Sequence, residues 1–596
     1  MARNKFDVDE ELEEQFNLGH LKRMFRYLKP HTHKLTITAV LMFVSNIAAL
    51  LGPYLVMDVV DKRVPQKDIK GVIAVSILYM IAITISVICL KYRIRAMAKI
   101  AQAVILDIRM DIFKHLQKLP FSYYDSRPHG KILIRVVNYV NSLNNLLTNG
   151  VINLITDLLS LGVIVVYMLI IDVRLTFISL AALPLLMLVM YILKRFQRKS
   201  WQQVSRKQSN MNAYVHESIC GIKVTQAFSR EDENLEIFDE CATEYKTAWM
   251  SAVKINHLIW PLSETISNMG VAFLYLVAIS WFENGISVGV LLAFSTYITK
   301  LWAPIVNLGN FYNQIIISMA YMERIFELLD EPVIVANVEG AYAMPKIKGD
   351  VSFKHVGFSY DEGHKVLKDV TFDIKAGETV ALVGATGCGK TTIVSLLSRF
   401  YNIQEGTITI DGHNISKVKL ESLRKQMGVM MQDTFLFSGT IMDNIRYSQL
   451  NAADKEVMEA ARIVKAHEFI MEFEHGYYTQ VNERGSRLSV GQRQLISFAR
   501  ALLADPKILI LDEATSSIDT KTEIALQQGL EKLLEGRTSF VVAHRLSTIK
   551  NADKIIYIDG GRIVEMGSHD ALMDQKGAYY HLYSAQYKIM TDDRAG

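Results

Sequence analysis

The stretch Gly384-Ala385-Thr386-Gly387-Cys388-Gly389-Lys390-Thr391 fits the phosphate-binding pattern G-x-x-x-x-G-K-[ST]. An apolar, β-branched run precedes it and a helical pattern beginning at Thr392 follows it, which is the strand, loop and helix context that the pattern requires. The glycines let successive backbone N–H groups turn toward phosphate oxygens, and the new helix adds the positive end of its dipole. Lys390 would reach the β- and γ-phosphates and Thr391 would bind magnesium. Residues 384–392 therefore predict a nucleoside triphosphate site, with a plain glycine-rich turn as the alternative.

The composition indicates a membrane part joined to a soluble part. The chain has 596 residues, 50% of them hydrophobic, which is long for one domain. The net charge is +4 and no basic block is interleaved with aromatics, so nothing indicates a nucleic-acid partner. Cysteines at 89, 220, 241 and 388 have no metal-ligand or disulfide spacing, and we expect reduced thiols. Residues 1–19 lack the pattern of a cleavable signal peptide, so the spans themselves should direct insertion.

Apolar segments of the length that a membrane-crossing helix needs, about 20 residues, recur through the first half of the chain. The loops 91–149 and 194–258 contain ten Lys or Arg each, against four in 61–70, which predicts that the two long loops are cytosolic. Residues 20–29 place bases opposite apolar side chains, which indicates an interfacial helix, or else an ordinary soluble one, inside an N-terminal segment 1–34. The six predicted spans, within a membrane domain 35–325, are 35–60, 72–90, 150–171, 173–193, 259–282 and 288–309.

The two long loops have helical periodicity, so we expect the spans to continue into the cytosol as extended helices. Each loop has a break near its middle, around 120–130 and around 214–222. At these breaks a membrane domain could contact a soluble motor, although simple helix hairpins are the alternative.

Ionisable residues inside the predicted spans are costly in lipid and by default face a cavity or a partner. Asp157 and Glu264 are therefore candidates for a substrate pathway, with a structural hydrogen bond between helices as the alternative. Lys300 can extend its charge toward the inner surface along its own aliphatic stem.

The second half contains the groups that an ATPase needs beside its phosphate loop. A linker, 326–345, precedes a domain at 346–588 and a tail at 589–596, and Tyr360 near the domain start could stack on adenine. A buried-strand pattern, 507–511, ends in Asp512 and Glu513. Asp512 would hold the metal through water, and Glu513 would be the general base. Another strand pattern ends in His544, placed to meet the γ-phosphate.

The run Leu488-Ser489-Val490-Gly491-Gln492-Arg493-Gln494 is similar to the LSGGQ signature. With six spans followed by one phosphate-loop domain, nearly the whole chain resembles a half-transporter of the ATP-binding cassette (ABC) exporter family. The resemblance implies a fold in which an α-helical membrane domain is followed by an α/β P-loop ATPase domain. It also implies ATP and Mg2+ as cofactors, and a second half-transporter as partner, because each ATP lies between the phosphate loop of one cassette and the signature of the other.

The family's roles carry over to matching positions. Gln432 resembles the magnesium-sensing glutamine, Asp519 lies in a loop at 516–519 that links the two ATP sites, and His544 matches the switch histidine. Residues 483–485 resemble an exporter segment that touches the inner loops, and the two breaks resemble coupling helices. Glu513, His544 and Gln432 are thus the implied catalytic residues; Thr391, Gln432 and Asp512 hold the metal; and Ser489, Gly491 and Gln492 contact the ATP of the partner.

Val490 departs from the family pattern, because it occupies the position of the first signature glycine. A branched side chain restricts the backbone and adds bulk near the partner's ATP, while Glu513 and His544 are intact. This asymmetry resembles the better-preserved subunit of a heterodimeric exporter, with a homodimer of two working sites as the alternative.

The sequence therefore predicts an ATP-driven exporter of amphipathic small molecules, drug-like or lipid-like, in a bacterial plasma membrane. Acidic residues in the spans favour amphipathic or cationic drugs as substrates, with lipids and peptides as open alternatives. A rival from another class is an ATP-gated channel or regulator on the same scaffold, for which no regulatory insertion is visible.

Overall fold

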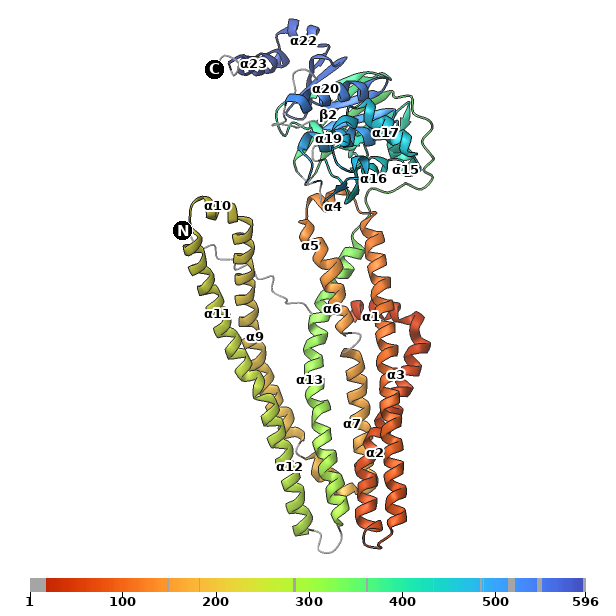
Figure 1. The fold of residues 1–596 in the computed structure, drawn as a ribbon, viewed down its shortest axis with the longest axis vertical. Helices are drawn as coiled ribbons and strands as arrows, with labels where there is room; N and C mark the ends of the chain where they lie inside the picture. The colour runs from red at the N-terminus through yellow and green to blue at the C-terminus, as the bar shows by residue number, and fades with distance from the viewer. Residues whose placement is uncertain are drawn as a thin grey trace. The chain divides into compact units, whose positions relative to one another are not determined.

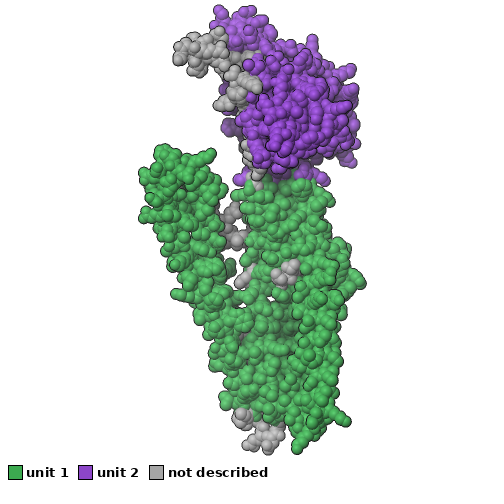
Figure 2. Space-filling model, viewed as in Figure 1, with its two compact units in different colours: residues 1–116, 129–331 green, residues 117–128, 332–596 purple. Residues whose placement is uncertain are grey.

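The computed structural model describes residues 18–592, except 147–149, 182, 282–285, 361–362, 432–433, 483–484, 486, 513–519 and 544–548. The chain forms two compact units, coloured separately in Figure 2. Unit 1 comprises Met1–Leu116 and His129–Glu331, and unit 2 comprises Gln117–Pro128 and Pro332–Gly596. A short segment from the first half of the sequence thus belongs to the second unit.

The described part of unit 1 is built from helices, as its long apolar and amphipathic runs predict. Helices α2, α3, α7 and α13 pack against one another, and α9 pairs with α11 as a long hairpin (Figure 1). Aromatic residues of α13 fill the core, where the buried Tyr297 hydroxyl donates to the Leu50 carbonyl at 2.9 Å. The helices are α1 (Leu18–Leu28), α2 (Thr32–Asp58), α3 (Ile69–Leu116), α5 (His129–Ile134), α6 (Val140–Asn145), α7 (Val151–Ile171), α8 (Val173–Leu180), α9 (Leu183–Cys220), α10 (Ile222–Ala227), α11 (Glu231–His257), α12 (Ile259–Trp281) and α13 (Val288–Asp330), with single turns η1 (Lys29–His31), η2 (Val59–Arg63) and η3 (Arg135–Tyr139).

Four helical segments in the described part of unit 1 are long and apolar enough to cross a membrane: Lys22–Arg63, Ile69–Leu116, Ile152–Ile171 and Val288–Asp330. They match four of the six predicted spans. The spans at 173–193 and 259–282 fall on α8 with the start of α9 and on α12, and they stay predictions. The predicted interfacial segment is helical, as α1, and its Arg23 forms an ion pair with Asp330 at 2.5 Å.

The break expected around 214–222 falls at Gly221, a residue of low helix propensity, between the end of α9 at Cys220 and the short helix α10. The linker begins at Glu331 rather than at 326, because α13 stays helical until Pro332 ends it. At the other end of the chain, α23 extends to Asp592, past the predicted domain end at 588.

Unit 2 combines a mainly parallel sheet, with the antiparallel strand β12 at its edge, and a smaller antiparallel sheet, which confirms the α/β prediction. The larger sheet has the order β12-β11-β3-β10-β9-β6, and the smaller one the order β2-β1-β4-β5. The strands are β1 (Val351–Ser359), β2 (Lys365–Ile374), β3 (Thr379–Val383), β4 (Glu405–Ile410), β5 (His413–Asn414), β6 (Met427–Met430), β7 (Gly439–Thr440), β8 (Gln480–Val481), β9 (Ile508–Asp512), β10 (Thr538–Val542), β11 (Lys554–Asp559) and β12 (Arg562–Gly567). The helices are α4 (Phe121–Asp125), α14 (Lys390–Leu397), α15 (Leu420–Arg424), α16 (Ile441–Arg446), α17 (Asp454–Ile463), α18 (His467–Met471), α19 (Val490–Leu503), α20 (Thr520–Leu534), α22 (His569–Gln575) and α23 (Ala578–Asp592), with turns η5 (Ile415–Lys417) and η6 (Gly476–Tyr478).

The parallel strands set the position of the site. Strand β3 lies between β10 and β11, and Val542 of β10 pairs with Leu382 of β3 and with Asp512 of β9. The carboxyl ends of β3, β9 and β10 therefore meet at one edge of the sheet, where ligands of open α/β sheets bind. The phosphate loop follows β3 at this edge.

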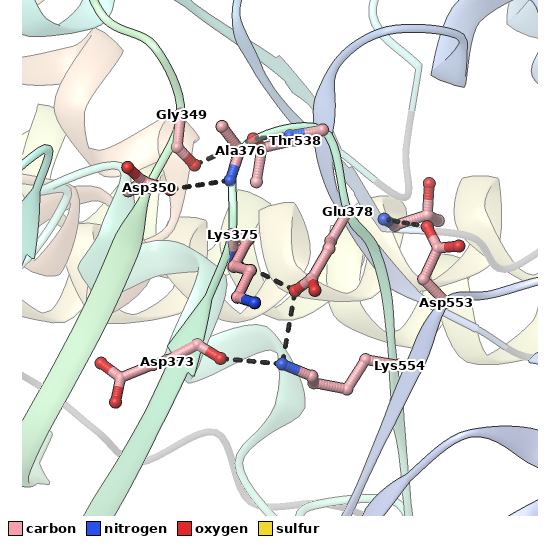
Figure 3. Close-up of polar contacts among 11 residues, drawn as sticks. Gly349, Asp350, Asp373, Lys375, Ala376, Glu378, Thr538, Asp553 and Lys554 are labelled. Carbon is pink, nitrogen blue, oxygen red and sulfur yellow. Dashed lines mark hydrogen bonds and ion pairs between the residues drawn. The ribbon is translucent and has the colours of Figure 1, made fainter.

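The opposite edge of the sheet is held by buried polar contacts (Figure 3). The Thr538 hydroxyl donates to the Gly349 carbonyl and accepts from the Gly377 N–H, both at 2.9 Å. Burial opposes ionisation of Glu378, but the N–H of Lys375 and the ammonium of Lys554 outweigh it, so the pKa of this carboxyl is lowered. These contacts join the segments before β1 and β3 to the first residues of β10 and β11, and so tie the two sheets together.

We predict that Thr538→Val lowers the free energy of unfolding of unit 2 by about 1–3 kcal/mol, because two buried backbone groups lose their partner at nearly constant volume. Chemical denaturation of the purified protein measures this change. Thr538→Ser keeps the hydroxyl and is the matched control. Equal stability of the valine variant and the wild type would contradict the role of these bonds.

Candidate ATP-binding site

The phosphate loop connects β3 to α14 through glycines in backbone conformations that other residues rarely adopt. Gly384, Gly387 and Gly389 have φ of +152°, +83° and +108°. A Cβ at Gly384 would lie 2.2 Å from the Ile558 carbonyl oxygen, so a side chain there is excluded by contact as well as by conformation. The loop thus has the shape that lets backbone N–H groups converge on phosphate at a helix N-terminus.

Lys390 lies in the first turn of α14 and is only 7% exposed. Its ammonium donates to the carbonyl oxygens of Gly384 and Ala385 at 2.8 and 2.9 Å, and lies 3.9 Å from the Cys388 sulfur. The charge is therefore held inside the loop, at the position where the sequence predicts phosphate contact.

Thr391 and Asp512 are brought together although they lie 121 positions apart. The Thr391 hydroxyl donates to the Asp512 carboxylate at 3.2 Å. A hydroxyl and a carboxylate beside a phosphate loop are the hard oxygen ligands with which Mg2+ is held together with substrate phosphates. The two residues fit the predicted magnesium site, where the ion would neutralise phosphate charge.

Tyr360 follows β1 and joins an aromatic cluster beside the phosphate loop. Its ring meets Phe358 and Tyr401 edge to face, with centroids 5.0 and 5.1 Å apart. Its hydroxyl bonds to Thr392 of α14 at 3.1 Å. Burial raises the pKa of the Tyr360 hydroxyl, which therefore stays neutral. The ring is still 47% exposed, which leaves a surface on which adenine can stack.

The signature run begins α19. Ser489 is its N-cap and forms a capping box with Gln492: the Gln492 N–H donates to the serine hydroxyl at 3.2 Å, and the Ser489 N–H to the Gln492 side chain at 2.9 Å. Gly491 is buried, whereas Val490 is 48% exposed in the first helical turn. The valine thus fits its own helix, and its side chain projects to solvent.

Other predicted site residues lie outside the described residues: Gln432, Glu513, Asp519 and His544. Residues 483–484 of the exporter-like segment lie outside them as well. Their roles stay predictions.

Asp157 and Glu264, the predicted substrate-pathway acids, are not brought together. Asn307 of α13 hydrogen-bonds the Asp157 carboxylate, and Arg93 of α3 interacts with it electrostatically. Arg93 also donates to Thr156 at 2.9 Å. Glu264 is exposed on α12. The Asp157 contacts favour the alternative, a polar link between helices.

Helix α4 contacts the ATP-binding domain within unit 2. The Tyr401 hydroxyl donates to the Asp125 carboxylate, and Phe121 packs on Phe400 with ring centroids 4.3 Å apart. Burial and then the bond to Asp125 raise the pKa of the Tyr401 hydroxyl. Tyr401 thus touches both Tyr360 and α4. Sequence reasoning missed Tyr401 and gave Asp125 no role; two aromatics directly after the phosphate-loop helix were the available signal.

Comparison with known proteins agrees with this architecture. The model of the ABC transporter transmembrane region matches residues 35–305, and that of the ABC transporter matches residues 367–516. The chain is 45% identical to the uncharacterized ABC transporter ATP-binding protein YknV of Bacillus subtilis (strain 168), over 98% of each chain. It is 32% identical to the ATP-dependent lipid A-core flippase of Syntrophus aciditrophicus (strain SB), over 100% of this chain and 99% of the relative.

A solved structure of a bacterial Atm1-family ABC exporter with ATP bound aligns with a TM-score of 0.77 at 28% identity, over 93% of this chain and 98% of the other. The putative multidrug export ATP-binding/permease protein YgaD of Bacillus subtilis (strain 168) is 36% identical over 96% of this chain and 100% of its own length. The chain belongs to the ABC transporter family and is built as an exporter of that family. It is a multi-pass membrane protein whose C-terminal domain hydrolyses ATP to drive transport.

We predict that Tyr401→Phe lowers the number of molecules transported per ATP hydrolysed by at least about threefold, because the ring packing is kept and the bond to α4 is lost. Transport and ATPase rates measured in the same proteoliposomes give this ratio. Tyr478→Phe removes a tyrosine bond to Asp454, 3.0 Å long, elsewhere in unit 2 and is the control. A ratio equal to that of the control would contradict a coupling role for Tyr401.

Proposed function

We propose that this chain is one half of a dimeric ABC exporter that moves amphipathic small molecules, drug-like or lipid-like, across a bacterial plasma membrane by alternating access. The observation that carries the proposal is the hydrogen bond between Thr391, which follows the phosphate-loop lysine, and Asp512 at the end of β9. It supports the proposal because both residues are predicted magnesium ligands. The relatives named for multidrug export and for lipid flipping support the substrate class.

In the proposed cycle, Lys390 and the loop N–H groups bind the ATP phosphates, and Thr391 and Asp512 hold Mg2+, which neutralises phosphate charge. Tyr360 stacks on adenine. Glu513 takes the proton of the attacking water. The contact of Tyr401 with Asp125 then carries closure of the cassettes into the membrane helices through α4.

The partner is a second half-transporter, and we propose a different chain rather than a second copy. One chain holds one phosphate loop and one signature, and in the family each ATP needs both from different cassettes. The tip of the α9–α11 hairpin supports a partner because it exposes apolar side chains: Ile219, Ile222, Val224 and Phe228 are 67%, 43%, 62% and 74% exposed. Val490 in the signature supports a different chain, since this half would hold a working ATP site and donate a weaker signature.

Replacing the proposed base separates binding from turnover. We predict that Glu513→Gln still binds ATP but lowers steady-state ATPase and ATP-dependent uptake into inside-out vesicles by at least about 100-fold, because general base catalysis typically contributes 10²–10⁴-fold. Unchanged turnover in the glutamine variant, or gradient-driven flux that ATP only gates, would contradict the proposal.

Lys390→Ala should instead weaken nucleotide binding itself, measured with a fluorescent ATP analogue.

The Val490 side chain gives a separate prediction for the donated signature. Val490→Gly should raise the ATPase rate of the dimer several-fold, because it removes bulk that faces the partner's ATP. Val490→Ala removes the branched methyl groups but keeps the Cβ. Its ATPase rate should lie between those of the wild type and Val490→Gly. An unchanged rate in both variants would support the homodimer with two equivalent sites.

A further inference from the structure

A cavity of about 880 Å³ lies within unit 1 between α7, α8, α9 and α13. Its volume is in the range of small-molecule sites, about 300–1,000 Å³. Leucine, isoleucine and valine side chains of α7, α8 and α13 form one part of its wall, and one face of α9 supplies half of the lining residues.

The lining face of α9 changes chemistry along its length. Met187, Met190 and Tyr191 line the first part, and Lys194, Arg195 and Arg198 line the next. Spacings of three and four residues put these side chains on one stripe of the helix. At about 1.5 Å per residue, the cations begin about 6 Å beyond Met190 along the helix axis. The cavity is therefore apolar at one end and triply cationic at the other.

The Lys194 side chain is oriented by a contact with α13, a second helix that lines the cavity. The Lys194 ammonium donates to the Asn310 side chain of α13 at 2.5 Å, so Lys194 turns toward the neighbouring helix. A lysine that only extends toward the membrane surface would follow its own helix to water. None of the described residues lining the cavity is acidic, and Asp157 and Glu264 are not among them.

We infer that this cavity binds an anionic amphiphile: a molecule with an alkyl chain against Met187 and Met190 and a phosphate or carboxylate group against Lys194, Arg195 and Arg198. The inference rests on the proposed export function and specifies its substrate class. It replaces the cationic preference that the acidic residues of the spans predict from sequence. Cationic groups that converge on one end of an apolar cavity favour a negatively charged head, and bonds between ionised partners are about twice as strong as neutral ones.

The test measures binding to the purified dimer by calorimetry in a nonionic detergent, without ATP. The probes are dodecyl phosphate, dodecyltrimethylammonium, which has the same chain with the opposite charge, and inorganic phosphate, which has the head without the chain. We expect dodecyl phosphate to bind at least about tenfold more tightly than either of the others. Equal affinity of the two alkyl probes would overturn the inference, and so would equal affinity of dodecyl phosphate and inorganic phosphate. No binding of any probe would overturn it as well, and is the result expected if helices of the partner fill the cavity.

A matched pair of variants locates the site. Lys194→Gln should weaken dodecyl phosphate binding about fivefold, whereas Lys199→Gln, which removes an exposed charge of α9 outside the cavity lining, should leave it unchanged. Equal weakening in both variants would show a general surface effect and overturn the inference. Binding is measured without ATP hydrolysis, so it can be judged separately from transport. If the dimer binds dodecyl phosphate as expected but does not transport, the export function is refuted and the inference about binding stands.

Discussion

The catalytic domain depends on a buried positive charge, that of Lys390, against which no carboxylate lies among the residues that the structure describes. The Lys390 ammonium is held by the carbonyl oxygens of Gly384 and Ala385 inside a loop that only glycines can form. Burying a cation is costly unless a negative group compensates it. The loop therefore gains most from an anion that brings several oxygens at once, which a triphosphate does. The free energy of ATP binding at this loop can drive closure of the two cassettes of an exporter.

Contacts continuous with the ATP site lead out to α4. Tyr360, which we propose stacks on adenine, meets the Tyr401 ring edge to face, and the Tyr401 hydroxyl donates to Asp125. These three residues belong to one compact unit although 235 and 276 positions separate Asp125 from the two tyrosines. In unit 1, the cavity-lining stripe of α9 changes from apolar side chains to cationic ones along the helix. One unit thus contains the ATP-binding domain, and the other contains the cavity that we infer to bind a charged amphiphile. ATP-driven export of such a molecule requires both.

The sequence predicts best where a local pattern carries the whole signal. The phosphate loop, the strand ending in Asp512 and the signature run at 488–494 were recognised from sequence, because each joins a short buried strand or a helix start to fixed residues. The helix cap at Ser489 was not predicted. The second break lies within the predicted range, at Gly221 between α9 and α10. The start of the linker was placed too early, because α13 stays helical to Asp330. The bond between Tyr401 and Asp125 and the cavity beside α9 could not be predicted, because each needs residues from elements far apart in the chain. Lys194 was visible as a charge, but its direction depends on Asn310.

The most direct test of the proposed heterodimer isolates the exporter from its native membrane through a tag on this chain. Its subunit composition and ATPase rate are then compared with those of the chain expressed alone. The account predicts a 1:1 complex with a second cassette-bearing chain, active only in that form, because the chain's own phosphate loop needs a competent signature from outside. Full ATPase activity of the chain alone, as a dimer of identical subunits, would contradict it and make Val490 a tolerated variation.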